Sequence, residues 1–100
     1  MLEAARLLGE QVRLARRTRR WTQADLAGRA GITVETLRKV EQGDLSVALG
    51  TALEAAALVG VPLFHDDPSR LTLDLDRTEA RSALLPKRVR RRSAEVKDDF

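Results

Sequence analysis

The chain has 100 residues, of which 43% are hydrophobic and 33% charged, as expected for one folded domain with a short extension. It contains no cysteine, which excludes disulfides, thiolate metal sites and cysteine nucleophiles. Its single histidine, His65, cannot form a zinc site alone. The formal net charge is only +3, no apolar stretch is long enough to span a bilayer and the N-terminus lacks a signal-peptide layout, so we expect a cytoplasmic protein. Because the aromatic residues are limited to Trp21, Phe64 and Phe100 and runs of β-branched residues are few, we predict an all-α fold.

The first predicted helix covers residues 2–18. Its apolar residues recur at spacings of three and four and form one helical stripe: Ala5, Leu8, Val12 and Ala15. The end of this helix and the residues after it carry a cluster of five arginines: Arg13, Arg16, Arg17, Arg19 and Arg20. Of these, we expect the side chain of Arg13 to be solvated.

Thr22 is predicted to cap a second helix, because threonine is a good N-cap and Asp25 follows three residues later, as in a capping box. Gly31 is predicted to end that helix, and Thr33 to cap a third helix that stops before Gly43. The residues expected to be buried are Leu26, Ala27 and Ala30 in the second helix, and Leu37 and Val40 in the third. Two short helices joined by such a turn form a helix-turn-helix unit.

A loop at residues 44–46 is followed by a fourth predicted helix over residues 49–59, which Gly60 closes. This helix is expected to bury Leu49, Leu53, Ala56 and Ala57. An apolar turn formed by Pro62, Leu63 and Phe64 is expected to pack on the core as the fifth element of a bundle. Residues 1–65 are therefore predicted to be one domain, with Trp21 and Phe64 in or beside its core.

Residues 66–85 are predicted to form an extension, which the sequence allows to be a helix or a strand. Asp67 and Pro68 resemble an N-cap followed by a proline at the first helical position. Leucines alternate with polar residues over 71–76, which is a strand pattern, but aspartate disfavours strands. The capping signals favour the helix. Residues 86–100 are expected to form a flexible tail that is basic and then acidic.

Three strings of residues fit one known pattern: Thr22-Gln23-Ala24-Asp25-Leu26-Ala27, then Gly31-Ile32-Thr33, then Leu37-Arg38-Lys39-Val40-Glu41-Gln42-Gly43. Together they resemble the Cro/C1-type, or Xre, helix-turn-helix family over about residues 8–61. The resemblance implies a five-helix lambda-repressor-like domain and a sequence-specific transcriptional repressor. An enzyme is not expected, and neither is a cofactor or a metal, because the sequence has no glycine-rich phosphate loop, metal cluster or nucleophile–base arrangement.

The resemblance also implies positions for the site. Contacts to bases are expected from the exposed face of the third helix: Thr33, Val34, Glu35, Arg38 and Lys39. Contacts to phosphates are expected from Gln23 and Thr22 at the start of the second helix, and the charge cluster beside it adds Arg17, Arg19 and Arg20. Arg16 and Glu41 are expected to form a structural ion pair between the first and third helices.

Two further strings resemble the HipB-like antitoxin branch of this family: Asp44-Leu45-Ser46-Val47-Ala48-Leu49-Gly50-Thr51, with Leu45 in place of the branch's proline, and Leu85-Pro86-Lys87-Arg88-Val89-Arg90. This resemblance implies a homodimer on a palindromic operator that represses its own operon and neutralises a HipA-like kinase toxin. We expect residues 66–85 to hold the dimer or a partner. The tail is expected to contact DNA or a partner through Lys87, Arg88, Arg90, Arg91 and Arg92. Two alternatives remain open: a stand-alone Xre regulator, and a protein-interaction adaptor that acts through residues 66–100.

Overall fold

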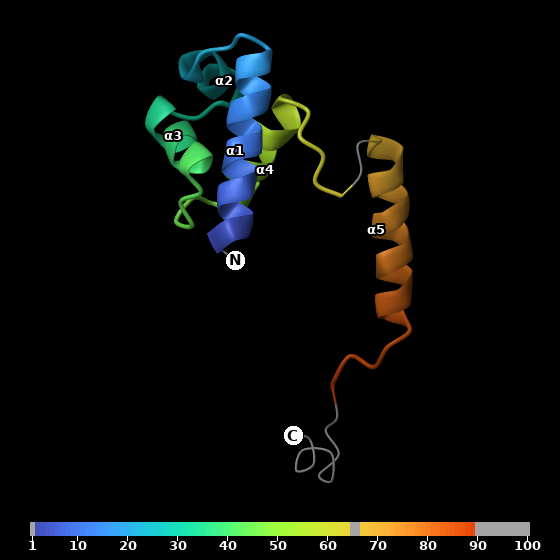
Figure 1. Cartoon of the computed structure of the whole chain (residues 1–100). Helices are drawn as coiled ribbons and strands as arrows, with labels where there is room; N and C mark the ends of the chain where they lie inside the picture. The colour runs from blue at the N-terminus through green and yellow to red at the C-terminus, as the bar shows by residue number, and fades with distance from the viewer. Residues whose placement is uncertain (1, 65–66, 90–100) are drawn as a thin grey trace. The chain divides into compact units, whose positions relative to one another are not determined.

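The computed structural model of the chain describes residues 2–64 and 67–89. The chain divides into two units, Met1–Asp66 and Asp67–Phe100. The first unit contains α1 (Leu2–Thr18), α2 (Gln23–Ala30), α3 (Val34–Gln42) and α4 (Leu49–Leu58), and the second contains α5 (Pro68–Ala83), as Figure 1 shows. The described residues form no strand, and the predicted all-α class is confirmed. None of these five helices is both long and apolar enough to cross a membrane.

The core of the first unit lies where α1 and α2 each pack on α3 and α4. It consists of small aliphatic side chains: Val12, Leu26, Ala27, Leu37, Val40, Ala55, Ala56, Val59 and Val61. The predicted stripe of α1 faces this core, with Val12 fully buried and Leu8 and Ala15 partly buried against it. Trp21 packs at the edge of the core, as the sequence predicts.

The predicted ends of α2 and α3 are confirmed. Thr22 Oγ1 accepts a hydrogen bond from Asp25 N at 3.0 Å, and the Asp25 carboxylate accepts one from Thr22 N at 2.8 Å, which completes a capping box. Gly31 ends α2 with a φ of 70°, a left-handed conformation that glycine adopts without steric cost. Thr33 Oγ1 accepts from Thr36 N at 3.1 Å and so caps α3. These local contacts fix the direction in which α3 leaves the turn.

Gly9 allows α1 to lie directly on the C-terminal turn of α3. A Cβ atom at this position would be 2.5 Å from the Val40 carbonyl oxygen and 2.6 Å from the Glu41 carbonyl oxygen, distances that real Cβ atoms essentially never show. Only glycine therefore permits this crossing. The sequence analysis did not identify Gly9, although the crossing is what brings the second half of α1 against Glu41.

The prediction that residues 62–64 pack on the core is wrong. The side chain of Phe64 is 82% exposed and that of Leu63 is 42% exposed. The chain in this segment forms no helix. Gly60, with a φ of 76°, turns the chain after α4, and Val61 is the last buried residue of the core. The core therefore ends at Val61, three residues before Phe64.

The predicted buried face of α4 is partly wrong. Leu49 is 72% exposed and Ala57 is exposed, whereas Ala55, which was not predicted, is fully buried. Ala56 is buried as expected, and Leu53 is half-buried. Because nearly every residue of α4 is apolar, the hydrophobic pattern does not define which side faces the core.

The helical alternative for the extension is confirmed by α5. Asp67 Oδ1 accepts a hydrogen bond from Ser69 N at 3.0 Å, and Pro68 occupies the first turn, as the capping signals predict. No residue of α5 is buried. Among the described residues 67–89, the apolar side chains of this helix therefore form no buried core.

Candidate nucleic-acid interface

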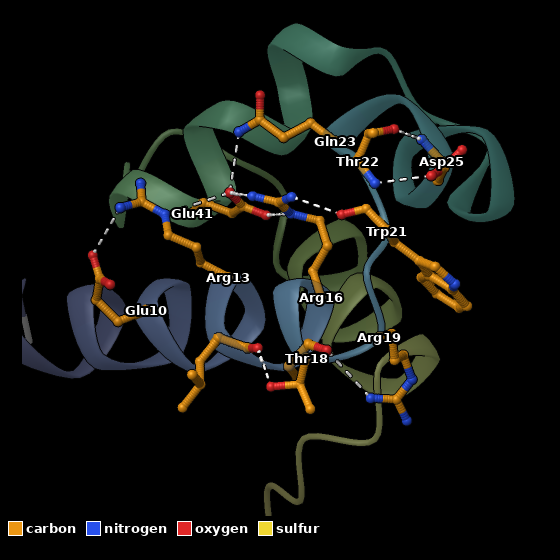
Figure 2. Close-up of polar contacts among 12 residues, drawn as sticks. Glu10, Arg13, Arg16, Thr18, Arg19, Trp21, Thr22, Gln23, Asp25 and Glu41 are labelled. Atoms are coloured by element: carbon orange, nitrogen blue, oxygen red, sulfur yellow. Dashed lines mark hydrogen bonds and ion pairs between the residues drawn. The ribbon is translucent and has the colours of Figure 1, made fainter.

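The carboxylate of Glu41, in the last turn of α3, is the centre of a polar network that joins α1, α2 and α3 (Figure 2). Arg16 Nε donates to Glu41 Oε2 at 2.7 Å, and Arg16 Nη2 donates to Oε1 at 3.1 Å. Gln23 Nε2 also donates to Oε1, at 3.1 Å, and Arg13 Nε lies 3.6 Å from the same atom. The structure thus brings Arg16 and Glu41 together in a bidentate pair, which is the strongest geometry for arginine and a carboxylate.

The Glu41 side chain is inaccessible to solvent, and only 8% of the Arg16 side chain is exposed. Burial alone would raise the pKa of Glu41, but hydrogen bonds from Arg16 and Gln23 and the charges of Arg16 and Arg13 outweigh it and hold the pKa below its ordinary value. Arg16 Nη1 also donates to the Trp21 carbonyl oxygen at 2.9 Å, which ties the α1–α2 connection to the network. No buried side-chain nitrogen or oxygen of the described residues lacks a hydrogen-bond partner. The network is therefore a satisfied structural unit.

Beside this network lies an open depression at the start of α2. The residues that line it come from α1, from the start of α2 and from the first residue of α3: Arg13, Arg16, Arg17, Thr22, Gln23, Ala24 and Val34. The capping box uses the N–H groups of Thr22 and Asp25, whereas those of Gln23 and Ala24 have no intrahelical acceptor. A helix N-terminus with free N–H groups and nearby arginines has the chemistry to bind a phosphate.

The predicted base-contacting residues lie on the outer side of α3. Glu35, Arg38 and Lys39 are exposed, while Leu37 and Val40 on the other side are buried in the core. Arg38 Nη1 donates to Glu35 Oε1 at 2.6 Å, one helical turn apart. The two charged side chains are therefore already oriented relative to each other on the exposed face.

The other two predicted base contacts lie at the N-terminus of α3. Val34 is half-buried, because it packs on the core and also lines the depression. Thr33 is exposed, and its hydroxyl accepts the capping hydrogen bond and donates to Thr36 Oγ1 at 2.9 Å. The start of α3 and the depression thus adjoin through Val34, and the predicted base and phosphate contacts occupy neighbouring surfaces.

The predicted phosphate-contacting arginines do not lie together. Arg17 lines the depression, but the Arg19 guanidinium lies 5.8 Å from the centroid of the Trp21 ring. Arg19 Nη1 donates to the Ala15 carbonyl oxygen at 3.5 Å, and its Nη2 would lie 3.1 Å from a Cβ atom at Gly60. Arg19 is therefore held where α1 meets the end of α4.

The remaining predicted site residues are accessible or lie outside the described residues. Arg20 is exposed, with a φ of 60° that is uncommon for a residue other than glycine. Lys87 and Arg88 are exposed. Arg90, Arg91, Arg92 and His65 lie outside the described residues. The described residues contain no group of histidine, aspartate or glutamate that could hold a metal.

The sequence analysis missed the role of Arg13, which was expected to be solvated. Its guanidinium bridges Glu10, at 3.5 Å, and Glu41, at 3.6 Å, and about two thirds of its side chain is covered. The signal was available, because Arg13 precedes Arg16 by three residues and so lies on the same side of α1.

In a comparison with protein families, a model described as a helix-turn-helix domain matches residues 7–65. The match covers more than half of the chain, including α1 from Leu7 onward, the whole of α2 to α4 and the depression, and it ends before α5. Comparisons with curated proteins and with solved structures gave no significant match.

Proposed function

The chain belongs to the helix-turn-helix domain family, and from that premise we propose that it is a sequence-specific transcriptional repressor that places α3 in the major groove of DNA. The observation that carries the proposal is the adjacency of two surfaces: the depression at the start of α2 and the exposed face of α3. Phosphate contacts at the first surface would fix the register of the protein, and side chains of the second would read base edges.

The phosphate contacts that we propose centre on Gln23 and Arg17. One N–H of the Gln23 side chain donates to Glu41, which holds the amide in place, and the amide group has a second N–H. The backbone N–H groups of Gln23 and Ala24 point out of the N-terminus of α2, where the helix dipole favours an anion. Arg17 lines the same depression and adds a charge. Thr22 also lines the depression, and the exposed Arg20 precedes it on the connection to α2.

The base contacts that we propose come from Arg38 and Lys39, with Glu35 and Val34 beside them. Glu35 holds one N–H of the Arg38 guanidinium, whose remaining N–H groups suit O6 and N7 of a guanine. Lys39 can donate to a second guanine, Glu35 can accept from a cytosine amino group, and Val34 suits a thymine methyl. Sequence preference would then favour G·C pairs at the centre of each half-site.

The repressor is proposed to act as a homodimer on a palindromic operator in the cytoplasm. One such domain covers few base pairs, and two recognition helices about 34–36 Å apart can read two half-sites on one side of the duplex. The second unit is the proposed dimer interface, because the apolar residues of α5 are not buried within it.

We further propose that the protein is a HipB-like antitoxin that represses its own operon and holds a HipA-like kinase toxin inactive. The string from Asp44 to Thr51 supports this proposal. Asp44 Oδ1 accepts from Ser46 N at 2.8 Å and from Ser46 Oγ at 2.7 Å, which makes the turn that a proline would otherwise favour. The exposed leucines of α5 favour an alternative, an adaptor that acts through residues 66–100.

The DNA-binding proposal is tested with the duplex upstream of the protein's own coding region. Loss of one bidentate base contact costs about 1–3 kcal/mol, so Arg38→Ala should weaken specific binding roughly 5- to 150-fold and leave non-specific binding nearly unchanged. Arg6→Ala removes the same charge from an exposed position of α1 outside the depression and is the matched control. Equal effects of the two variants, or no preference for the upstream duplex, would contradict the proposal.

The antitoxin proposal is tested by an affinity pull-down of the native protein. Recovery of a kinase would support it, and recovery of no kinase would favour the stand-alone regulator. The adaptor alternative predicts that Gln23→Ala and Lys39→Ala leave the cellular phenotype unchanged, whereas truncation at Pro86 abolishes it.

A further inference from the structure

Exposed leucines lie on two sides of α5: Leu71 and Leu75 on one side, and Leu73, which is 39% exposed, on the opposite side. Leu71, Leu75, Thr78 and Ser82 follow one another at spacings of four, three and four residues, so they lie along a single stripe of the helix. Leu71 is 40% exposed and Leu75 is 57% exposed. The stripe is therefore available to a partner surface.

Because several residues of α5 are poor helix formers, this helix needs a partner surface to pack against. Isolated helices shorter than about 12–15 residues are marginal in water even when they are rich in alanine, and most helical stability in proteins comes from packing of an apolar face. α5 has 16 residues, and several of them, such as Thr72, Asp74 and Asp76, have low helix propensity. We expect its apolar stripe to be covered when the helix is fully formed.

The charges of α5 indicate what covers it. The helix carries three arginines and three carboxylates, which are Arg70, Arg77 and Arg81 and Asp74, Asp76 and Glu79. A membrane-surface helix or a nucleic-acid-binding helix would have a basic polar face. A helix with balanced charges of both signs is instead complementary to a copy of itself.

The positions of these charges select one orientation. By helix geometry, Asp74 and Arg81 border the stripe on one side, and Glu79 borders it on the other. In an antiparallel pair the same sides meet, so Asp74 of each copy lies near Arg81 of the other. In a parallel pair opposite sides meet, so Asp74 of each copy lies near Glu79 of the other, and the two carboxylates repel each other.

We propose that α5 pairs antiparallel with α5 of a second copy through the stripe of Leu71, Leu75, Thr78 and Ser82. The two-fold axis then passes between residues 77 and 78, midway between Asp74 and Arg81. The inference rests on the proposed function in one respect, since it supplies the dimer that a two-half-site operator requires. DNA binding by a single copy does not depend on it.

Disulfide cross-linking tests the orientation directly. The chain has no cysteine, so an introduced cysteine can pair only with its equivalent in another copy. In the antiparallel pair, the two copies of residue 78 lie on the facing stripes within about 2 Å of each other along the helices, whereas the two copies of residue 71 lie about 20 Å apart along them. A disulfide requires Cα atoms within about 7 Å. Oxidised Thr78→Cys should therefore become a covalent dimer, and Leu71→Cys should not.

Charge reversal provides a second measurement that needs no cross-link. Asp74→Arg should weaken the dimer roughly fivefold to tenfold, because two attractive pairs become repulsive, and Asp74→Arg/Arg81→Asp should restore it. In a parallel dimer the same Asp74→Arg substitution would remove a carboxylate repulsion and strengthen association. Sedimentation equilibrium of the full chain measures both changes.

Two results would overturn the inference: cross-linking of Leu71→Cys as readily as Thr78→Cys, or a chain that stays monomeric at the concentrations where it binds DNA. A monomer that still prefers its upstream duplex would leave the DNA-binding proposal standing. A dimer that cross-links at residue 78 but ignores that duplex would support the pairing and contradict the repressor.

Discussion

Arg16 and Glu41 lie 25 residues apart in the chain and form a bidentate pair, with Arg16 Nε 2.7 Å from Glu41 Oε2 and Arg16 Nη2 3.1 Å from Oε1. The pair connects α1 to the last turn of α3. Glu41 Oε1 also accepts from Gln23, so a carboxylate with a structural role holds the amide that we propose for phosphate binding. Stability of the first unit and geometry of the candidate interface are coupled through this one side chain.

Arg16→Ala should destabilise the first unit by about 3–5 kcal/mol, because it leaves Glu41 as a buried charge without its main partner. Since a typical total is only about 5–15 kcal/mol, such a loss removes a large share of the stability and should lower the unfolding midpoint steeply. Urea and thermal unfolding followed by circular dichroism measure the change. Arg17→Ala, at the exposed neighbouring position, should stay within about 0.5 kcal/mol of the parent. An unchanged midpoint for Arg16→Ala would show that the pair does not stabilise the fold.

The stability of the first unit should fall in acid through Glu41. Its pKa is lower in the folded chain than its ordinary value of 4.5, so its contribution is complete above that value and is lost as the pH falls through the folded pKa. Glu41→Gln has no charge to lose at this position. The free energy of unfolding of the parent should therefore approach that of Glu41→Gln as the pH is lowered from about 6 to about 3. A constant difference between the two proteins would contradict this assignment.

Gly9→Ala and Gly28→Ala make the same chemical change in two helices and should have opposite effects. At Gly9 the new Cβ would meet the backbone of Val40 and Glu41, and the expected cost is about 1–3 kcal/mol. At Gly28 nothing lies within 4 Å, and alanine should stabilise α2 by up to about 1 kcal/mol through its higher helix propensity. Chemical denaturation measures the free energy of unfolding of both variants. If Gly9→Ala leaves it unchanged, α1 can move away from α3 at little cost.

Arg17→Ala should reduce the salt dependence of DNA binding, lowering the slope of log affinity against log salt by about 1 for a lost phosphate contact. Arg19→Ala should leave the slope unchanged, because Arg19 is held beside Trp21 and Gly60 instead of lining the depression. Affinity is measured for both variants across a salt series on the same duplex. If Arg19→Ala lowers the slope as much as Arg17→Ala does, the depression is not the surface that faces the backbone.

The parts of the fold that the sequence predicted correctly depend on local chemistry. Thr22 with Asp25, and Thr33 with Thr36, make their capping contacts within one turn, and Gly31 takes a conformation that few other residues adopt. Such signals act over three or four residues and can be recognised without knowing the tertiary structure. The same reasoning identified Asp67 as the cap of α5.

The parts that were wrong or missed depend on the directions in which helices pack. The apolar residues of α4 surround the helix, so Leu49 was placed inside and Ala55 was not considered. Phe64 was assigned to the core for its hydrophobicity, but Val61 completes the core before the chain reaches it. Gly9 and Arg13 gain their roles only where α1 meets α3, a contact between segments distant in the sequence.

Trp21 is the chain's single tryptophan, and the guanidinium carbons of Arg29 and Arg19 lie 4.2 Å and 5.8 Å from the centre of its ring. Its carbonyl oxygen is also bound by Arg16. Since indole emission responds to nearby charges and to solvent, the protein carries an intrinsic fluorophore at the joint between α1 and α2. Residues 67–100 contain neither tryptophan nor tyrosine, so within this chain the signal originates in the first unit.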